Sequence, residues 1–145
     1  MDQASVRNIS LFFFLSLLDS SMALSLSTKA KKELEQLLEK NDQLSPGAAF
    51  VRITNHFLGE KEFKMRGYRA ESQLVGFDLP PGLDLKPWRD FRKKASLDEI
   101  AMVLWFLVFK ISDKDISEAI SISAGTVRYR TARAVLRLGK AVQNG

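Results

Sequence analysis

The C-terminal segment from Ala119 to Gly145 contains five basic residues and no acidic one, and its apolar residues recur with α-helical spacing. At about 100° per residue, the apolar and small residues share one face, which we expect to pack inward. That face consists of Val127, Thr131, Ala134, Val135 and Leu138. Three arginines line up well away from it, namely Arg130, Arg133 and Arg137. Since 22 basic and 17 acidic residues give the chain a net charge of +5, the excess positive charge is concentrated on this predicted helix.

A shorter helix is predicted immediately before this one. Ser112 is suited to cap it, and Asp113 and Asp115 are favourable near the positive end of a helix dipole. Its apolar side consists of Ile116, Ala119 and Ile120. Residues 121–123 then predict a turn, after which Ser123 caps the long helix. Two helices joined by a short turn, with a basic outer face on the second, are typical of a helix-turn-helix that enters the DNA major groove.

The stretch from Asp115 to Arg130, with ISAGTVRYR at its end, followed by Arg133, Ala134 and Leu138, resembles the fourth conserved region of bacterial sigma factors. It is most similar to the extracytoplasmic-function type, and the resemblance covers about residues 96–140. It implies an all-helical module that binds the −35 promoter element and contacts the β-subunit flap of RNA polymerase. The DNA-facing residues that it implies are Thr126, Arg128, Tyr129, Arg130 and Arg133. We add Arg137 because it lies in the same arginine stripe, which is expected to contact phosphates.

One position in the turn departs from this family. Ser121 stands where the family usually has Gly. If the turn requires a positive φ at this position, Ser raises the energy by about 1 kcal/mol. The geometry of the turn is therefore a point for the structure to decide.

Residues 1–80 do not resemble the second region of sigma factors, and we predict a mainly helical N-terminal lobe for dimerisation, regulation or partner binding. A Pro- and Gly-rich linker is expected at 81–87, before a helix-turn-helix domain at 88–145. The apolar run at 11–18 has the length of a signal-peptide core, but a buried or interface helix is the favoured interpretation. Because three successive Phe are not expected to face one core from one helix, this run is the strongest candidate for a self-association surface.

Local signals predict where several helices begin. Ser27 and Thr28 are expected to cap a helix, and Ser45 is expected to cap another that has Pro46 in its first turn. The Ser-x-x-Glu spacing at Ser96 predicts a capping box. The almost wholly apolar residues 100–109 that follow predict a central helix covered by its neighbours.

Residues 60–72 interleave basic and aromatic side chains, which indicates either an ordinary amphipathic helix or a nucleic-acid face. A weaker hypothesis is a small-ligand site at Lys64, Arg66 and Arg69.

The residue inventory argues against an enzyme. The chain has no Cys, a single His and no Gly-rich phosphate loop, and we predict neither a cofactor nor a metal. We therefore expect an all-α, cytoplasmic transcription regulator that binds double-stranded DNA, with no membrane association. RNA polymerase and a second copy of the chain are further possible partners. The alternative is an interaction module that binds an RNA polymerase subunit or another transcription factor without contacting DNA.

Overall fold

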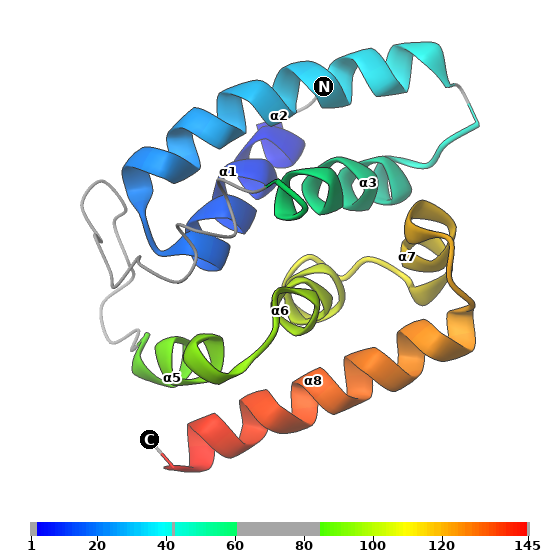
Figure 1. The fold of residues 1–145 in the computed structure, drawn as a ribbon. Helices are drawn as coiled ribbons and strands as arrows, with labels where there is room; N and C mark the ends of the chain where they lie inside the picture. The colour runs from blue at the N-terminus through cyan, green and yellow to red at the C-terminus, as the bar shows by residue number, and fades with distance from the viewer. Residues whose placement is uncertain (1–2, 42, 61–84, 145) are drawn as a thin grey trace.

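The computed structural model describes residues 3–41, 43–60 and 85–144, and every secondary-structure element in these ranges is helical (Figure 1). The predicted all-α fold is therefore confirmed for this part of the chain. No helix within these ranges has the length and apolar character needed to cross a membrane. The basic–aromatic segment with Lys64, Arg66 and Arg69, and residues 81–84 of the predicted linker, lie outside the described residues.

α1 (Gln3–Leu17) is mostly buried in its C-terminal half. Phe12, Phe13 and Phe14 are 0%, 0% and 1% exposed, so the expectation that they cannot all be buried is wrong. The reason is that helices cover α1 from several sides. Phe12 stacks on Trp105, with ring centroids 6.3 Å apart, and Phe13 meets Phe57 edge to face. The apolar run at 11–18 is thus a buried helix, and it does not form an exposed self-association surface.

α2 (Ser20–Lys40) begins earlier than the sequence predicts. Its N-cap is Asp19, whose carboxylate accepts a hydrogen bond from the Met22 amide at 3.0 Å. Ser27 is buried within the helix and donates its hydroxyl hydrogen to the carbonyl oxygen of Ala23. The predicted cap at Ser27 and Thr28 is therefore wrong, because the helical pattern continues through both residues.

The other predicted helix starts are confirmed. α3 (Pro46–Leu58) is capped by Ser45, which accepts a hydrogen bond from the Ala48 amide at 3.1 Å. α5 (Lys86–Lys94) and α6 (Leu97–Val103) follow. Ser96 caps α6 in a capping box with Glu99, in which each side chain accepts a hydrogen bond from the backbone of the other residue.

The apolar segment that continues α6 is only partly covered. It becomes a π-helical turn, η1 (Leu104–Val108), in which the Phe109 amide donates to the Leu104 carbonyl oxygen at 2.9 Å. Trp105 is buried, but three following residues are 40–46% exposed: Phe106, Leu107 and Val108. Because a π turn has a smaller angular step than an α turn, it directs these side chains away from the core. The expectation that residues 100–109 are covered on all sides is therefore wrong for this last turn.

The two predicted domains share one hydrophobic core in the described residues. Beside the Phe12–Trp105 stack, hydrogen bonds connect the N-terminal helices to the later ones. The indole of Trp88 donates to the Leu15 carbonyl oxygen at 2.8 Å, and that of Trp105 donates to the Thr54 hydroxyl at 2.9 Å. Arg92 Nε donates to the Ser16 carbonyl oxygen at 2.6 Å, and the Ser45 hydroxyl at the start of α3 donates to Asp115 Oδ1 on α7 at 3.0 Å. The division into a lobe at residues 1–80 and a domain at residues 88–145 stays a prediction.

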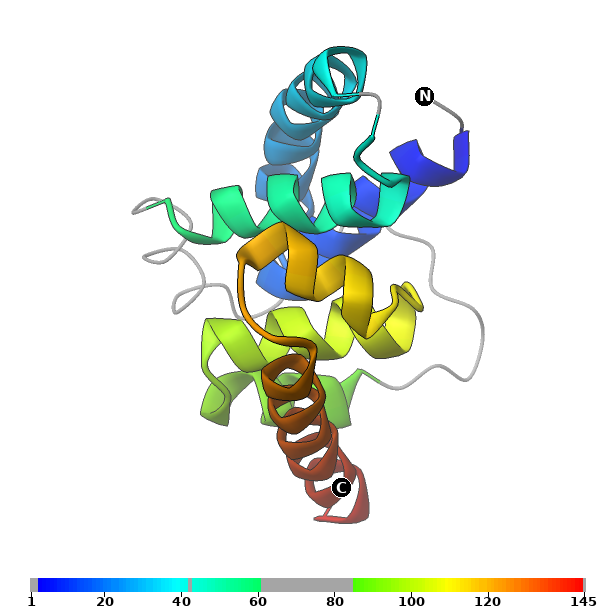
Figure 2. The ribbon, with the colours of Figure 1, turned by 90° about the vertical axis from the view of Figure 1, so that its right-hand side faces the viewer.

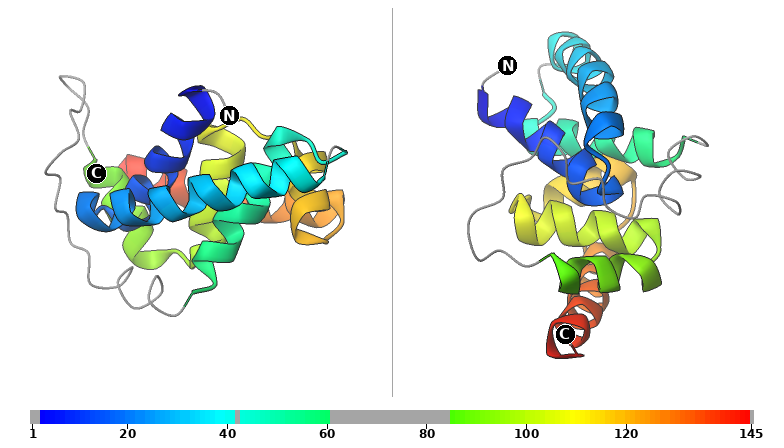
Figure 3. Two further views of the ribbon diagram at one scale, coloured as in Figure 1. Left: turned by 90° about the horizontal axis from the view of Figure 1, so that it is seen from above. Right: turned by 90° about the vertical axis from the view of Figure 1, so that its left-hand side faces the viewer.

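The last two helices lie at one side of the molecule. α7 (Asp113–Ile120) packs on α3, and α8 (Ala124–Asn144) packs on α5, α6 and α7. In Figures 1 and 2, α2 runs along one edge of the molecule and α8 along the opposite edge. The right-hand view of Figure 3 shows α5 and α6 between the N-terminal helices and α8. The outer side of α8 is therefore not covered by the N-terminal helices.

Candidate nucleic-acid interface

α7, residues 121–123 and α8 form the predicted corner of two helices. Ser112 caps α7 by accepting a hydrogen bond from the Asp115 amide at 3.1 Å. Within the corner, the Ile122 amide donates to the Ser117 carbonyl oxygen at 3.3 Å. Ser123 accepts a hydrogen bond from the Thr126 amide at 3.1 Å, and so it caps α8 as predicted. Backbone and side-chain hydrogen bonds thus fix the angle between the helices from both sides of the turn.

Ser121 ends α7 in the left-handed region, with φ 58° and ψ 44°. Its amide donates to the Ser117 carbonyl oxygen, which is a common way to terminate a helix. Glycine adopts this conformation without steric cost, whereas a residue with a Cβ does not. The turn therefore requires a positive φ at residue 121. This backbone conformation is sterically unfavourable for Ser121, because it has a Cβ.

The inward face of α8 agrees with its helical pattern at four of the five predicted positions, whereas Val135 is only half-buried. Val127 and Ala134 are fully buried, and Thr131 is buried with its hydroxyl against the sulfur of Met102. Leu138 packs at the edge of the core. This packing determines which way the polar residues of α8 point.

Four of the predicted site residues line one groove of about 520 Å³ between α8 and the start of α6: Thr126, Tyr129, Arg130 and Arg133. Tyr129 is 67% exposed, and both arginines are also exposed. Within the described part of the chain, neither Arg130 nor Arg133 forms an ion pair. These side chains are therefore available to a ligand.

The other two predicted residues, Arg128 and Arg137, form ion pairs within the molecule. Arg128 Nη1 lies 2.8 Å from Asp113 Oδ2 on α7, and Arg137 Nη1 lies 2.9 Å from Glu99 Oε1 on α6. The hydrogen bond from Arg128 holds the pKa of Asp113 below its usual value. The structure thus separates the predicted set: four residues share the groove, and the remaining two face different neighbours.

The groove also contains two carboxylates that the sequence analysis did not assign to it. Asp98 and Glu99 belong to the first turn of α6 and lie in the same groove as Arg130 and Arg133. Glu99 Oε1 serves both the capping box and Arg137, while its Oε2 is buried and has no hydrogen-bond partner in the described ranges. The Ser-x-x-Glu spacing that includes these residues predicts the cap of α6, but it does not indicate that α8 packs beside them.

The described residues contain no group of three or more His, Cys, Asp or Glu side chains that could hold a metal ion. The single histidine, His56, is exposed, and its Nε2 lies 3.5 Å from Oε1 of Glu60, which follows the end of α3. No protein-family model, curated protein or solved structure matches the chain. The interpretation of the groove therefore depends on its own chemistry.

Proposed function

We propose that the chain binds double-stranded DNA through a helix-turn-helix formed by α7, residues 121–123 and α8, and that it regulates transcription by reading promoter DNA. The observation that carries this proposal is the groove in which Arg130 and Arg133 are exposed without an ion pair, beside Thr126 and Tyr129. The proposal also draws on the resemblance of residues 96–140 to the fourth region of bacterial sigma factors.

The roles of these residues follow from the chemistry of duplex DNA. Thr126 and Tyr129, near the start of α8, have hydroxyl groups for base edges in the major groove. Arg130 and Arg133 neutralise phosphates, and this releases about one counterion for each contact. The outer edge of α8 lies away from α2, so the approach of DNA requires no movement of the N-terminal helices (Figure 1).

The test begins with selection of bound duplexes from a random pool by the full chain. Binding of a selected duplex is then measured by fluorescence anisotropy for the wild type and for Arg130→Ala/Arg133→Ala. The control Lys29→Ala/Lys32→Ala removes the same charge from exposed positions on α2, at the opposite edge. We expect a loss of about tenfold or more for the first variant, together with a salt slope that is smaller by about 2. The control should lose much less.

Equal affinity in the two double variants would contradict the proposal.

A second variant tests whether removing a negative charge from the groove strengthens DNA binding. Asp98→Asn removes a carboxylate that lies in the same groove as the two arginines, so DNA affinity should rise by about threefold to fivefold. A fall in affinity, with an unchanged unfolding midpoint, would argue against DNA lying in this groove.

A second candidate function is an interaction module that binds an RNA polymerase subunit or another transcription factor without DNA. It is favoured by exposed apolar residues on α8, since Leu136 and Val142 are 62% and 56% exposed. Leu136→Glu distinguishes the two functions. Under this alternative it abolishes binding to purified RNA polymerase, and the wild type shows no affinity for any selected duplex. Under the main proposal, the variant retains DNA binding.

A further inference from the structure

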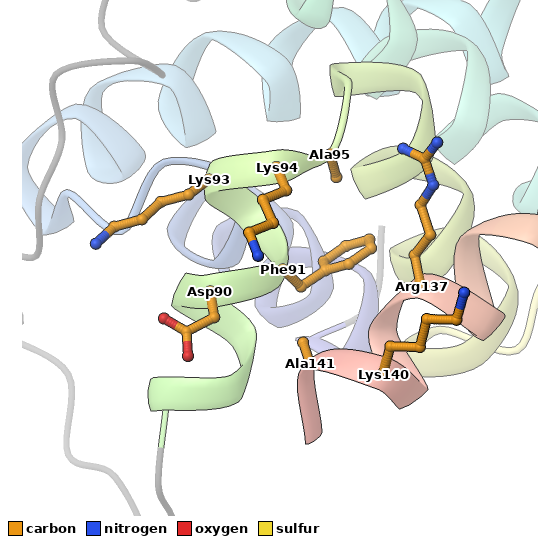
Figure 4. A pocket seen from close by; sticks show the side chains of 8 residues that line it. All are labelled: Asp90, Phe91, Lys93, Lys94, Ala95, Arg137, Lys140 and Ala141. Carbon is orange, nitrogen blue, oxygen red and sulfur yellow. The ribbon is translucent and has the colours of Figure 1, made fainter. Parts of the chain in front are cut away.

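A second pocket, of about 450 Å³, lies between α5 and the C-terminal part of α8 (Figure 4). It is separate from the proposed DNA groove, since the two have no lining residue in common. Its apolar lining consists of Phe91, Ala95 and Ala141. The charged lining consists of one carboxylate, Asp90, and four basic residues: Lys93, Lys94, Arg137 and Lys140. The volume lies in the range that is usual for sites of small organic ligands.

The charges of this pocket are not balanced from within the described residues. Lys94 and Lys140 lie on opposite sides of the Phe91 ring (Figure 4), and neither forms an ion pair with a carboxylate in the described ranges. Arg137 forms an ion pair with Glu99, in which Arg137 Nη1 lies 2.9 Å from Glu99 Oε1. Asp90 also lines the pocket, but it points away from the Phe91 ring in Figure 4 and forms no ion pair with either lysine in the described ranges.

Local helix chemistry accounts for only part of this arrangement. Basic residues in the last turn of α5 are favourable beside the negative end of the helix dipole. Lys93 fulfils this role and also lines the pocket, but its side chain extends away from the Phe91 ring (Figure 4). Lys94 is directed toward the Phe91 ring instead, and Lys140 comes from a different helix. The helix dipole of α5 does not explain the position of Lys140.

We propose that this pocket binds a small organic phosphate ester, with the apolar body of the ligand against Phe91, Ala95 and Ala141. The phosphate lies at the mouth of the pocket, where the flexible stems of the exposed Lys94 and Lys140 allow both ammonium groups to reach it. Charge-assisted hydrogen bonds from two ammonium groups suit a doubly charged group better than a carboxylate. The methylene groups of both lysines extend the apolar wall. This inference does not depend on the proposed DNA binding.

The probe is 1-naphthyl phosphate, which combines an aromatic body with a phosphate. Titration of the full chain is followed by calorimetry and by the amide resonances of Ala95 and Ala141. We expect a dissociation constant below about 1 mM, with shifts at both amides. Inorganic phosphate, which lacks the body, and 1-naphthoate, which carries one charge, should each bind at least about tenfold more weakly.

Lys94→Gln/Lys140→Gln should weaken binding of 1-naphthyl phosphate by about tenfold or more. Lys29→Gln/Lys32→Gln, which removes the same charge from exposed positions on α2, should change it less than about twofold. Lys94 and Lys140 are exposed, and an unchanged unfolding midpoint checks the fold of their double variant. Equal affinity in the wild type and Lys94→Gln/Lys140→Gln would overturn the proposal. So would equal affinity for naphthoate, or shifts confined to residues of the DNA groove.

Discussion

Replacing Ser121 with Gly should stabilise the protein. The residue has φ 58° and ψ 44°, a left-handed conformation that costs an L-residue about 1–2 kcal/mol. Gly removes this cost, but it adds about 0.4–1 kcal/mol of conformational entropy to the unfolded chain. The Ser121 hydroxyl is exposed and has no hydrogen bond in the described structure, so its loss is neutral. The expected net gain is about 1 kcal/mol in the free energy of unfolding.

The assay is urea denaturation followed by circular dichroism, with a thermal scan in parallel. For a chain of this size, about 1 kcal/mol corresponds to an increase of roughly 3–4 °C in Tm, with an unchanged urea m-value. Ser121→Ala removes the hydroxyl but keeps the Cβ, so its stability should stay close to that of the wild type. The comparison of Gly with Ala separates backbone strain from side-chain effects.

Two other positions with positive φ extend the test. Lys110, at φ 54°, is exposed, so Lys110→Gly should also stabilise the protein by about 1 kcal/mol. Leu18, at φ 53°, is buried, and Leu18→Gly should destabilise it by at least about 2 kcal/mol because the lost packing exceeds the relieved strain. The reasoning fails if Ser121→Gly is neutral or destabilising, or if Ser121→Ala gains as much.

Further predictions concern packing and pH. In Gly47→Ala, the new Cβ lies 2.8 Å from Asp115 Oδ2, so the carboxylate must move and we expect a loss of about 1 kcal/mol. Gly139→Ala on α8 meets nothing within 4 Å and should gain up to about 1 kcal/mol, as urea denaturation of both variants will show. Because the hydrogen bond from Arg128 lowers the folded pKa of Asp113, its contribution to stability is present above the unfolded pKa of about 4 and is lost as pH falls through the folded pKa. The stability difference between the wild type and Asp113→Asn should therefore disappear on acidification, and a constant difference from pH 6 to pH 2 would contradict this.

Features that depend on a few neighbouring residues could be predicted from the sequence. Caps at Ser45, Ser96, Ser112 and Ser123 involve a hydroxyl and an amide three residues later, so the pattern contains both partners. The inward face of α8 was also predictable, because helical periodicity identifies its buried positions.

Long-range pairings could not be predicted in this way. Phe12 is buried against Trp105, and nothing near Phe12 in the sequence indicates that a later helix supplies this contact. The same holds for Arg137, whose partner Glu99 has its own local explanation in a capping box. Helical periodicity predicts which arginines lie on one face of α8. Whether an arginine forms an ion pair, and with which carboxylate, depends on how the helices pack.

This division of charge changes what DNA binding should look like. If all five basic residues of α8 contacted phosphates, the salt slope of DNA binding would be near −4.5, since each phosphate contact contributes about −0.9. In the structure Arg128 and Arg137 are held by carboxylates, and Lys140 lines the pocket beside α5. Only Arg130 and Arg133 then contribute, with a combined slope near −2. A measured contribution from Arg128 or Arg137 would mean that its ion pair breaks on binding, so single substitutions of these arginines report which intramolecular contacts DNA displaces.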